Sequence, residues 1–354
     1  MSDTITIKKP FDAHVHLRRG AVLRAVTHYT AERFSKAIVM PNTEPPIDTL
    51  DAAIEYKNEV LAAPGVGSFE PLMTLYLTKN LTPDEIARAA VGSDGTKIYG
   101  VKYYPYGATT NSQWGYKDIL EAKETLSEME KAGVPLLLHG EVHLNEHGKE
   151  EDPYDGEKLF IGDVLPRLLE QFPSLKVSLE HMSSATACDF IEKNGEEGRL
   201  VATVTPTHLM YDRTQAFAGG YHTLYHMKPL VKRSEDKERV RDIATKGLPF
   251  VSAGTDSAPH PEGKKFSSCC VFGAFNSPAA VELYAQVFEE MNALDNLETF
   301  LSLNGPKFYG VEPSEETVTL EKKDWQLAEP VVTEENVKLW PMFTGETLHW
   351  HLTQ

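Results

Sequence analysis

Residues 11–20 have the sequence FDAHVHLRRG, in which a short apolar run ends in two histidines, His14 and His16, placed two positions apart. Side chains two apart on a β-strand point to the same side. Two imidazoles at the end of one strand could therefore hold a single metal ion. The spacing alone is weak evidence, because the same pattern occurs at His349 and His351 in the C-terminal stretch TLHWHL.

The same pattern, an apolar run that ends in polar residues, recurs along the chain. Eight such runs lie at 4–17, 36–42, 69–78, 98–105, 134–142, 175–182, 200–209 and 248–260. Amphipathic stretches such as 48–63 and 117–133 lie between them, as helical crossovers do between parallel strands. Eight β/α units over roughly 260 residues match an α/β fold of the (β/α)8 TIM-barrel type. We expect the barrel over 1–310 and a C-terminal extension over 311–354 packed on it.

Composition limits the kinds of partner. The chain has 354 residues, 41% of them hydrophobic, and a formal net charge of -17, which opposes binding to nucleic acid or anionic membranes. No run of about 18 apolar residues occurs, and the N-terminal MSDTITIKKP lacks the apolar core of a signal peptide. The only cysteines are Cys188, Cys269 and Cys270, too few for a disulfide framework. We expect a cytoplasmic protein with a small-molecule ligand and neither a nucleic-acid nor a membrane partner.

Two further histidines, His139 in LLLHGE and His181 in VSLEHM, directly follow apolar runs. Each could be a buried histidine satisfied by backbone hydrogen bonds, or a neutral metal ligand. In a barrel the carboxyl ends of all strands meet at one mouth, so residues far apart in sequence share one site. Because His14 and His16 also lie at a strand end, we favour the interpretation that His139 and His181 are metal ligands.

A lysine and an aspartate complete this set. Lys102 in YGVKYYP ends an apolar strand, where an ammonium would be repelled by metal cations. A lysine that has reacted with carbon dioxide is instead an anionic carbamate whose oxygens can bridge two metals. Asp256 in VSAGTDSAPH could simply cap a turn, or it could be a metal ligand that also transfers a proton.

Arg18, Asn42 and His260 lie beside these candidates in sequence. Taken singly, they could be a solvated arginine, a turn residue and a loop histidine. Arginine offers a planar fork that suits a carboxylate. Taken together, three groups able to bind a carboxylate around a metal site indicate an anionic substrate.

These motifs resemble the amidohydrolase superfamily, and within it the dihydroorotases of the short, monofunctional bacterial and fungal type. The resemblance covers nearly the whole chain, through HVHLR, MPNTEPP, VKYYP with GATTN, LLLHGE, LEHMSS, TPTHLMYDR, and GTDSAPH followed by KKFSSCC. It implies a reversible cyclisation of N-carbamoyl-L-aspartate to L-dihydroorotate with loss of water, the third step of pyrimidine synthesis. It also implies a homodimer.

The resemblance assigns roles to particular residues. One zinc is expected on His14, His16, Lys102 and Asp256, and a second on Lys102, His139 and His181, with carboxylated Lys102 and a hydroxide between them. The substrate carboxylate is expected on Arg18, Asn42 and His260. Thr109 and Thr110 match a mobile loop that closes over the ligand, and Leu224 and Phe272 match positions that contact the pyrimidine ring through main-chain groups. Phe272 departs from the small residue that is usual there.

Two alternatives remain open. One is another cyclic-amide hydrolase on the same scaffold, such as a hydantoinase, and the other is an inactive barrel that serves as a binding or assembly subunit. The first histidine pair begins at residue 14, which leaves no room for the N-terminal β-sandwich half of hydantoinases and dihydropyrimidinases. Every expected ligand position also holds a competent residue, so we favour an active dihydroorotase.

Overall fold

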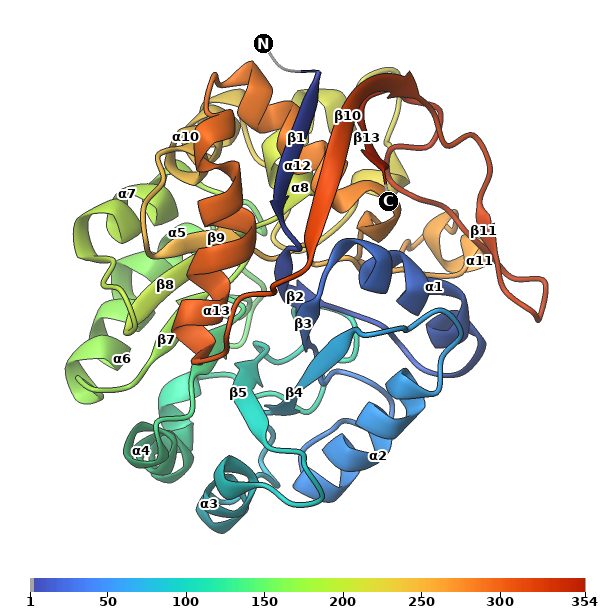
Figure 1. The fold of residues 1–354 in the computed structure, drawn as a ribbon. Helices are drawn as coiled ribbons and strands as arrows, with labels where there is room; N and C mark the ends of the chain where they lie inside the picture. The colour runs from blue at the N-terminus through green and yellow to red at the C-terminus, as the bar shows by residue number, and fades with distance from the viewer. Residues whose placement is uncertain (1–2, 354) are drawn as a thin grey trace.

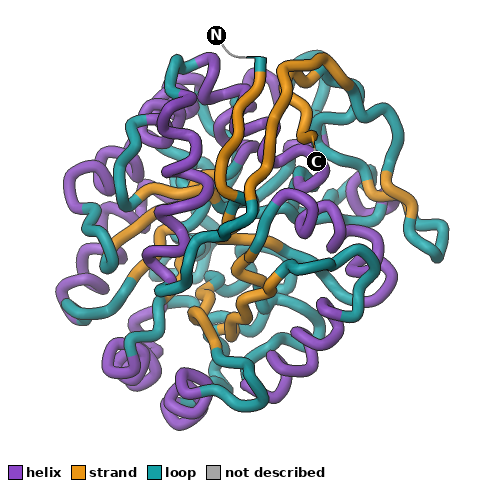
Figure 2. Tube along the Cα trace, in the orientation of Figure 1, coloured by secondary structure: helices purple, strands orange, loops and turns teal. Residues whose placement is uncertain are grey.

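The computed structural model describes residues 3–353, and its centre is a parallel sheet of eight strands in the order β2-β3-β4-β5-β6-β7-β8-β9. Helices surround the strands on the outside (Figures 1 and 2). The strands are β2 (Phe11–Val15), β3 (Lys36–Val39), β4 (Glu70–Tyr76), β5 (Ile98–Tyr103), β6 (Leu136–Leu138), β7 (Val177–Leu179), β8 (Leu200–Val204) and β9 (Val251–Ala253). The predicted (β/α)8 barrel is confirmed.

The first and last barrel strands meet beyond their ladder ends. The Asp256 N–H donates to the carbonyl of His14 over 2.8 Å, and the His16 N–H donates to the carbonyl of Ser257 over 3.0 Å. Val15 and Ser257 form a parallel bridge at the same level. This seam brings two of the polar strand ends together directly.

The helices alternate with the strands along most of the chain. The α-helices are α1 (Gly20–Arg33), α2 (Leu50–Leu61), α3 (Pro83–Val91), α4 (Lys123–Ala132), α5 (Gly156–Leu159), α6 (Leu165–Gln171), α7 (Ala185–Asn194), α8 (Pro206–Met210), α9 (Arg213–Ala216), α10 (Ser234–Thr245), α11 (Glu262–Lys265), α12 (Ala280–Glu290) and α13 (Asn304–Tyr309). Short turns of other helix types are η1 (Ile119–Ala122), η2 (Phe160–Val164), η3 (Thr223–Tyr225), η4 (Ser277–Ala279), η5 (Leu294–Asn296) and η6 (Thr299–Leu303). The two predicted helices correspond to α2, capped by the side chain of Thr49, and to η1 with α4, which ends at the left-handed Gly133.

Barrel strands are buried on both faces, which explains their nearly continuous apolar sequence. In β6, Leu136 and Leu138 belong to the large core shared with the outer helices, whereas Leu137 packs inside the barrel with Ile38 and Val201. Residue 139 has the inward parity of Leu137, so a polar side chain there points into the barrel.

A second sheet lies beside the barrel and joins the two ends of the chain (Figure 1). It has the antiparallel order β1-β10-β13, formed by β1 (Thr4–Lys8), β10 (Thr317–Trp325) and β13 (Leu348–Thr353). The run 4–17, predicted as one strand, is therefore split. Pro10 separates β1 from β2 and has no N–H with which to continue a ladder.

The remaining strands, β11 (Val331–Val332) and β12 (Lys338–Leu339), form a small hairpin, and β13 packs on α12. Within residues 3–353, none of the helices has the length and apolar character needed to cross a membrane.

Candidate active site

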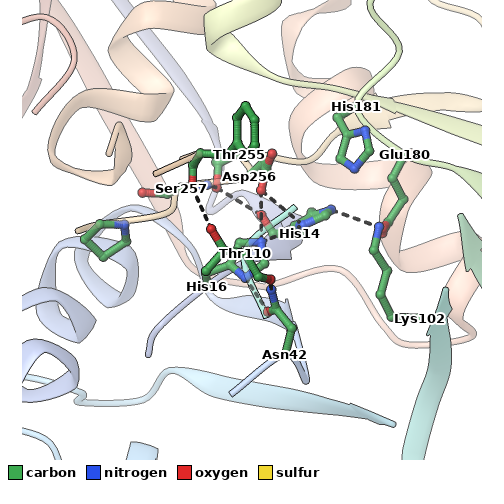
Figure 3. Close-up of polar contacts among 12 residues, drawn as sticks. His14, His16, Asn42, Lys102, Thr110, Glu180, His181, Thr255, Asp256 and Ser257 are labelled. Atoms are coloured by element: carbon green, nitrogen blue, oxygen red, sulfur yellow. Dashed lines mark hydrogen bonds and ion pairs between the residues drawn. The ribbon is translucent and has the colours of Figure 1, made fainter. Parts of the chain in front are cut away.

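A cleft opens where the barrel strands end, and most of the predicted site residues line it. Those that line it are His14, His16, Arg18, Asn42, Thr109, Thr110, His139, His181, Asp256 and Phe272. Lys102 on β5 is completely buried behind this wall, and His260 is 8% exposed. Figure 3 shows His14 and His16 facing Asp256, which follows the last barrel strand, with the Lys102 side chain ending at Glu180 beside His14.

His14, His16 and Asp256 form a tight triangle. The two Nε2 atoms of the histidines lie 3.2 Å apart, and Asp256 Oδ1 lies 3.2 Å from His14 Nε2 and 3.0 Å from His16 Nε2. Ligand atoms on one tetrahedral zinc ion, with bonds of about 2.0–2.1 Å, are about 3.3 Å apart. The triangle is therefore close to the size that a single metal ion requires.

Asp12 fixes the backbone at two corners of this triangle through hydrogen bonds. Its carboxylate accepts hydrogen bonds from the His14 N–H over 3.1 Å and the Thr255 N–H over 2.8 Å, and from the Thr255 hydroxyl over 2.6 Å. Burial raises the pKa of Asp12 to about 6, although these donors oppose the rise. One buried carboxylate thus fixes the ends of both β2 and β9.

The pKa values of His14 and His16 are shifted in opposite directions. Burial lowers the pKa of His14, but the carboxylates of Glu180 and Asp256 outweigh it and raise that pKa to about 9. Burial lowers the pKa of His16 to about 4, despite its contact with Asp256. The carboxylates of Glu180 and Asp256 therefore favour a positive charge at His14. A bound metal cation would provide that charge in place of a proton.

Lys102 forms a fully buried ion pair with Glu180. Glu180 Oε2 also lies 3.1 Å from His14 Nδ1, without the alignment of a hydrogen bond. Burial lowers the pKa of Lys102, and the Glu180 carboxylate opposes that shift. A lowered pKa favours the neutral amine, which is the form that can react with carbon dioxide.

His139 and His181 form the other side of the group, with ring centroids 4.7 Å apart. Glu141 Oε2 lies 2.7 Å from His139 Nε2, which fixes the proton on that nitrogen and leaves Nδ1 with a free lone pair. His181 Nδ1 has no hydrogen-bond partner among the described residues. Burial lowers the pKa of both histidines, so both are neutral and able to act as ligands.

Three residues of the site have left-handed backbones that are unusual for residues other than glycine. The φ angles are 63° at Arg18, 45° at His181 and 47° at Asp256. Such strain persists only where neighbouring contacts hold it. The His181 N–H, for example, donates to the Thr203 hydroxyl over 3.0 Å.

The carboxylate-binding candidates cluster on the β2 side of the cleft. Arg18 NH2 lies 2.9 Å from His260 Nε2, and its Nε donates to the carbonyl of Pro259 over 3.1 Å. His260 Nε2 also lies 2.8 Å from the carbonyl of Phe272. Burial and the nearby Arg18 cation lower the pKa of His260 well below its usual value.

The loop that contains Thr109 and Thr110 reaches across to these groups. The Thr110 hydroxyl donates to the carbonyl of Phe272 over 3.1 Å, and the Asn42 side-chain amide donates to the carbonyl of Thr110 over 3.1 Å. Asn42 Oδ1 lies 2.8 Å from His16 Nδ1. The loop is thus tied to β3 and to the segment after β9 at the same time.

The side chain of Leu224 does not line the cleft, and its predicted main-chain contact with the ring stays a prediction. This side chain packs against a separate cluster that includes Met227 and Phe343. The residue of that segment that lines the cleft is Lys228, four positions later. Sequence reasoning also missed Tyr104, which lines the cleft and whose buried hydroxyl has no partner within residues 3–353.

Glu141 and Glu180 were missed as well, although a signal was present. Glu141 comes two positions after His139 in LLLHGE, and Glu180 comes directly before His181 in LEHMSS. Carboxylates commonly orient metal-binding histidines. Lys228 carried only a weaker signal, as a charged residue directly before a proline in a loop.

Known proteins match the chain over nearly its full length. Dihydroorotase of Halorhodospira halophila is 44% identical over 360 residues, which cover 99% of each chain. Mitochondrial dihydroorotase of Arabidopsis thaliana is 43% identical over 98% of this chain and 90% of its own length. The chain belongs to the dihydroorotase family.

Structural similarity agrees with this assignment. The Saccharomyces cerevisiae dihydroorotase in complex with 5-fluoroorotic acid has a TM-score of 0.91 and 34% identity, covering 99% of this chain and 98% of the other. An L-hydantoinase from Arthrobacter aurescens shares the fold, with a TM-score of 0.80 at 16% identity. No protein-family model matches the chain. Dihydroorotases are hydrolases of cyclic amides, and so is this enzyme.

Dihydroorotases are metal-dependent, and the site fits a metal. His14, His181 and Asp256, all buried, offer ligand atoms that lie within 4.8 Å of one another. His181 Nδ1 is buried and lacks a hydrogen-bond partner among the described residues. A buried set of nitrogen and carboxylate donors is what zinc prefers.

Proposed function

We propose that this dihydroorotase performs the reversible cyclisation of N-carbamoyl-L-aspartate to L-dihydroorotate plus water at the barrel mouth, the third step of UMP biosynthesis. The observation that carries the proposal is the buried triangle of His14, His16 and Asp256 beside the paired Arg18 and His260. Acid–base and carboxylate-binding groups thus lie around one cleft.

Two zinc ions per chain would be held by the strand ends. His14, His16, Lys102 and Asp256 would hold one, and Lys102, His139 and His181 the other, with Lys102 carboxylated. When bound, the metals supply Lewis-acid polarisation of the scissile carbonyl and a lower pKa for the attacking water. The lowered pKa of Lys102 supports its carboxylation.

Asp256 would move the proton. In hydrolysis it takes a proton from the attacking water and returns it to the ring nitrogen that leaves. In cyclisation it takes a proton from the ureido nitrogen and delivers it to the departing oxygen. Contacts with His14 and His16 hold the pKa of Asp256 well below its usual value despite burial, so the carboxylate is ready to act as a base.

Arg18, Asn42 and His260 would bind the carboxylate that does not react. An incoming carboxylate can accept from Arg18 in place of His260 Nε2, which lies 2.9 Å away in the ligand-free arrangement. Thr109 and Thr110 would close over the ligand, and the main chain at Phe272 would contact the ring. This placement gives orientation and discriminates against uncharged cyclic amides.

The decisive experiment measures dihydroorotate formation by the purified enzyme with zinc and bicarbonate, alongside elemental analysis. We expect turnover and about two zinc ions per chain, and expect Lys102→Ala and Asp256→Ala to lose nearly all activity. Absence of zinc together with absence of turnover would support an inactive barrel. Retained activity in Lys102→Ala would contradict the bridging carbamate.

A hydantoinase activity makes a different prediction. Turnover of an uncharged hydantoin would depend little on Arg18, whereas turnover of dihydroorotate should fall strongly in Arg18→Ala. We further propose a cytoplasmic homodimer, as the family resemblance implies. Sedimentation of the purified chain and fractionation of its cells test these two points.

A further inference from the structure

Lys228 is a buried cation on the wall of the cleft that the proposed mechanism does not use. Its side chain is 7% exposed, and its nearest charged partner is Glu141 Oε1 at 3.6 Å, beyond ordinary hydrogen-bond distance. Within residues 3–353 the Lys228 ammonium makes no hydrogen bond, although it has three N–H donors. It also lies 5.8 Å from the ring centroid of Phe272.

Lys232, in the same segment, shows what a structural lysine looks like here. Its side chain is 5% exposed, and its ammonium donates to the Ser183 hydroxyl over 2.6 Å. It lies 4.0 Å from Glu157 Oε2 and does not line the cleft. Both lysines are buried near a glutamate. Of the two, Lys228 lines the cleft and makes no hydrogen bond to the described protein, whereas Lys232 donates to Ser183.

The partner of Lys228 is itself committed elsewhere. Glu141 Oε2 contacts His139 Nε2 at 2.7 Å, and Oε1 has no hydrogen-bond partner within the described chain. Glu141 therefore balances the charge of Lys228 without satisfying its donors. The Lys228 ammonium thus lines the cleft with N–H donors that no described protein group accepts, and an oxygen of a bound ligand can accept from them.

The position of Lys228 in the barrel sets where a ligand can meet it. Arg18 follows β2, whereas Lys228 lies against Glu141 and thus His139, at the end of β6. In the closed order from β2 to β9, β6 is four strands from β2, on the opposite side of the barrel. Lys228 therefore stands between the Glu141 side of the cleft and Phe272, where a ligand held by Arg18 can place a ring oxygen against it.

We propose that Lys228 is a further substrate-binding residue, which donates to a ring carbonyl oxygen of L-dihydroorotate and to the corresponding oxygen of N-carbamoyl-L-aspartate. This inference rests on the proposed function. It gives the acidic enzyme a second cationic contact for the substrate, in addition to Arg18.

The test compares Lys228→Met with Lys232→Met in the zinc-loaded enzyme. The probe is 5-fluoroorotate, which carries both a carboxylate and ring carbonyls, and its affinity is measured by calorimetry together with kcat, KM and zinc content. Lys228→Met should weaken binding about 10- to 100-fold with zinc content unchanged, since a hydrogen bond from a charged donor is lost. Lys228→Arg should recover part of the loss, and Lys232→Met should bind within about threefold of wild type. Equal affinity of Lys228→Met and wild type would overturn the inference.

A double variant separates substrate binding from charge balance. If Lys228 only neutralises Glu141, the Glu141→Gln/Lys228→Met enzyme binds 5-fluoroorotate as tightly as Glu141→Gln alone, at equal zinc content. If Lys228 contacts the ligand, the double variant binds about 10- to 100-fold more weakly than Glu141→Gln. A wild-type enzyme that neither turns over dihydroorotate nor binds 5-fluoroorotate would refute the proposed function itself, a result distinct from failure at Lys228.

Discussion

HVH at 14–16 and HWH at 349–351 have the same spacing of histidines on a strand but different surroundings. His14 and His16 are 1% and 7% exposed and meet Asp256 in the cleft. The side chain of His349 is 48% exposed and contacts Asp324 at 2.8 Å on the second sheet. The ring of His351 lies edge-on to Trp325, with centroids 5.3 Å apart.

The middle residues of the two motifs behave alike. Val15 and Trp350 are 1% and 0% exposed, and both belong to the main hydrophobic core. What differs is the other face of the strand. A barrel strand has its second face inside the barrel, where other strand ends converge, whereas a strand of the second sheet turns its second face outward. Position in the fold, and not spacing, decides which histidine pair faces the cleft.

Removing each histidine pair should give the largest difference between the two motifs. The His14→Ala/His16→Ala variant should lose bound zinc and lose activity on the order of 1000-fold or more. The His349→Ala/His351→Ala variant should keep both. Elemental analysis and the dihydroorotate assay measure this contrast, and zinc loss in the second variant would contradict it.

Val15 and Trp350 test the feature that the two motifs share, which is the burial of the middle residue in the hydrophobic core. Trp350→Ala should lower the free energy of unfolding by about 3–5 kcal/mol, because it leaves a large cavity in the core. Zinc content and kcat should be unchanged below the melting temperature. Val15→Ala removes less volume but lies between two ligands, so it should lower zinc occupancy as well. Denaturant unfolding and zinc titration of both variants check this prediction.

Arg18 separates substrate binding from metal binding within the first motif. Arg18→Ala should lower kcat/KM for dihydroorotate about 10- to 100-fold with zinc content unchanged, because a charge-assisted contact to a carboxylate is lost. Arg19→Ala is the matched control. Arg19 pairs with Glu59 at 3.3 Å outside the cleft, so its removal should change kcat/KM less than about twofold.

The smallest effect is expected at the exposed pair of the second motif. A double-mutant cycle of His349→Ala and Asp324→Ala should give a coupling energy below about 1 kcal/mol, since both side chains are largely exposed. Thermal unfolding measures it. A larger coupling energy would show that the pair stabilises the fold despite its exposure.

Sequence reasoning located the barrel and its polar strand ends because both depend on local patterns. Apolar runs that end in His14, Lys102, His139 or Asp256 are visible without a structure. Which strands pair is not local, so the division of 4–17 between two sheets could not be foreseen.

Loop residues were the harder part of the site. Leu224 and Lys228 lie in a segment without periodicity, so the sequence could not show that the Lys228 side chain lines the cleft while the Leu224 side chain packs away from it. Tyr104 escaped notice because its missing hydrogen-bond partner is a property of three-dimensional packing.

The seam between β2 and β9 also bears on synthesis of the enzyme. His14 is translated before Thr255 and Asp256, which follow only after the other seven barrel strands. A nascent chain therefore cannot form the hydrogen bond from Thr255 to Asp12, or the complete triangle, until the last barrel strand has been made.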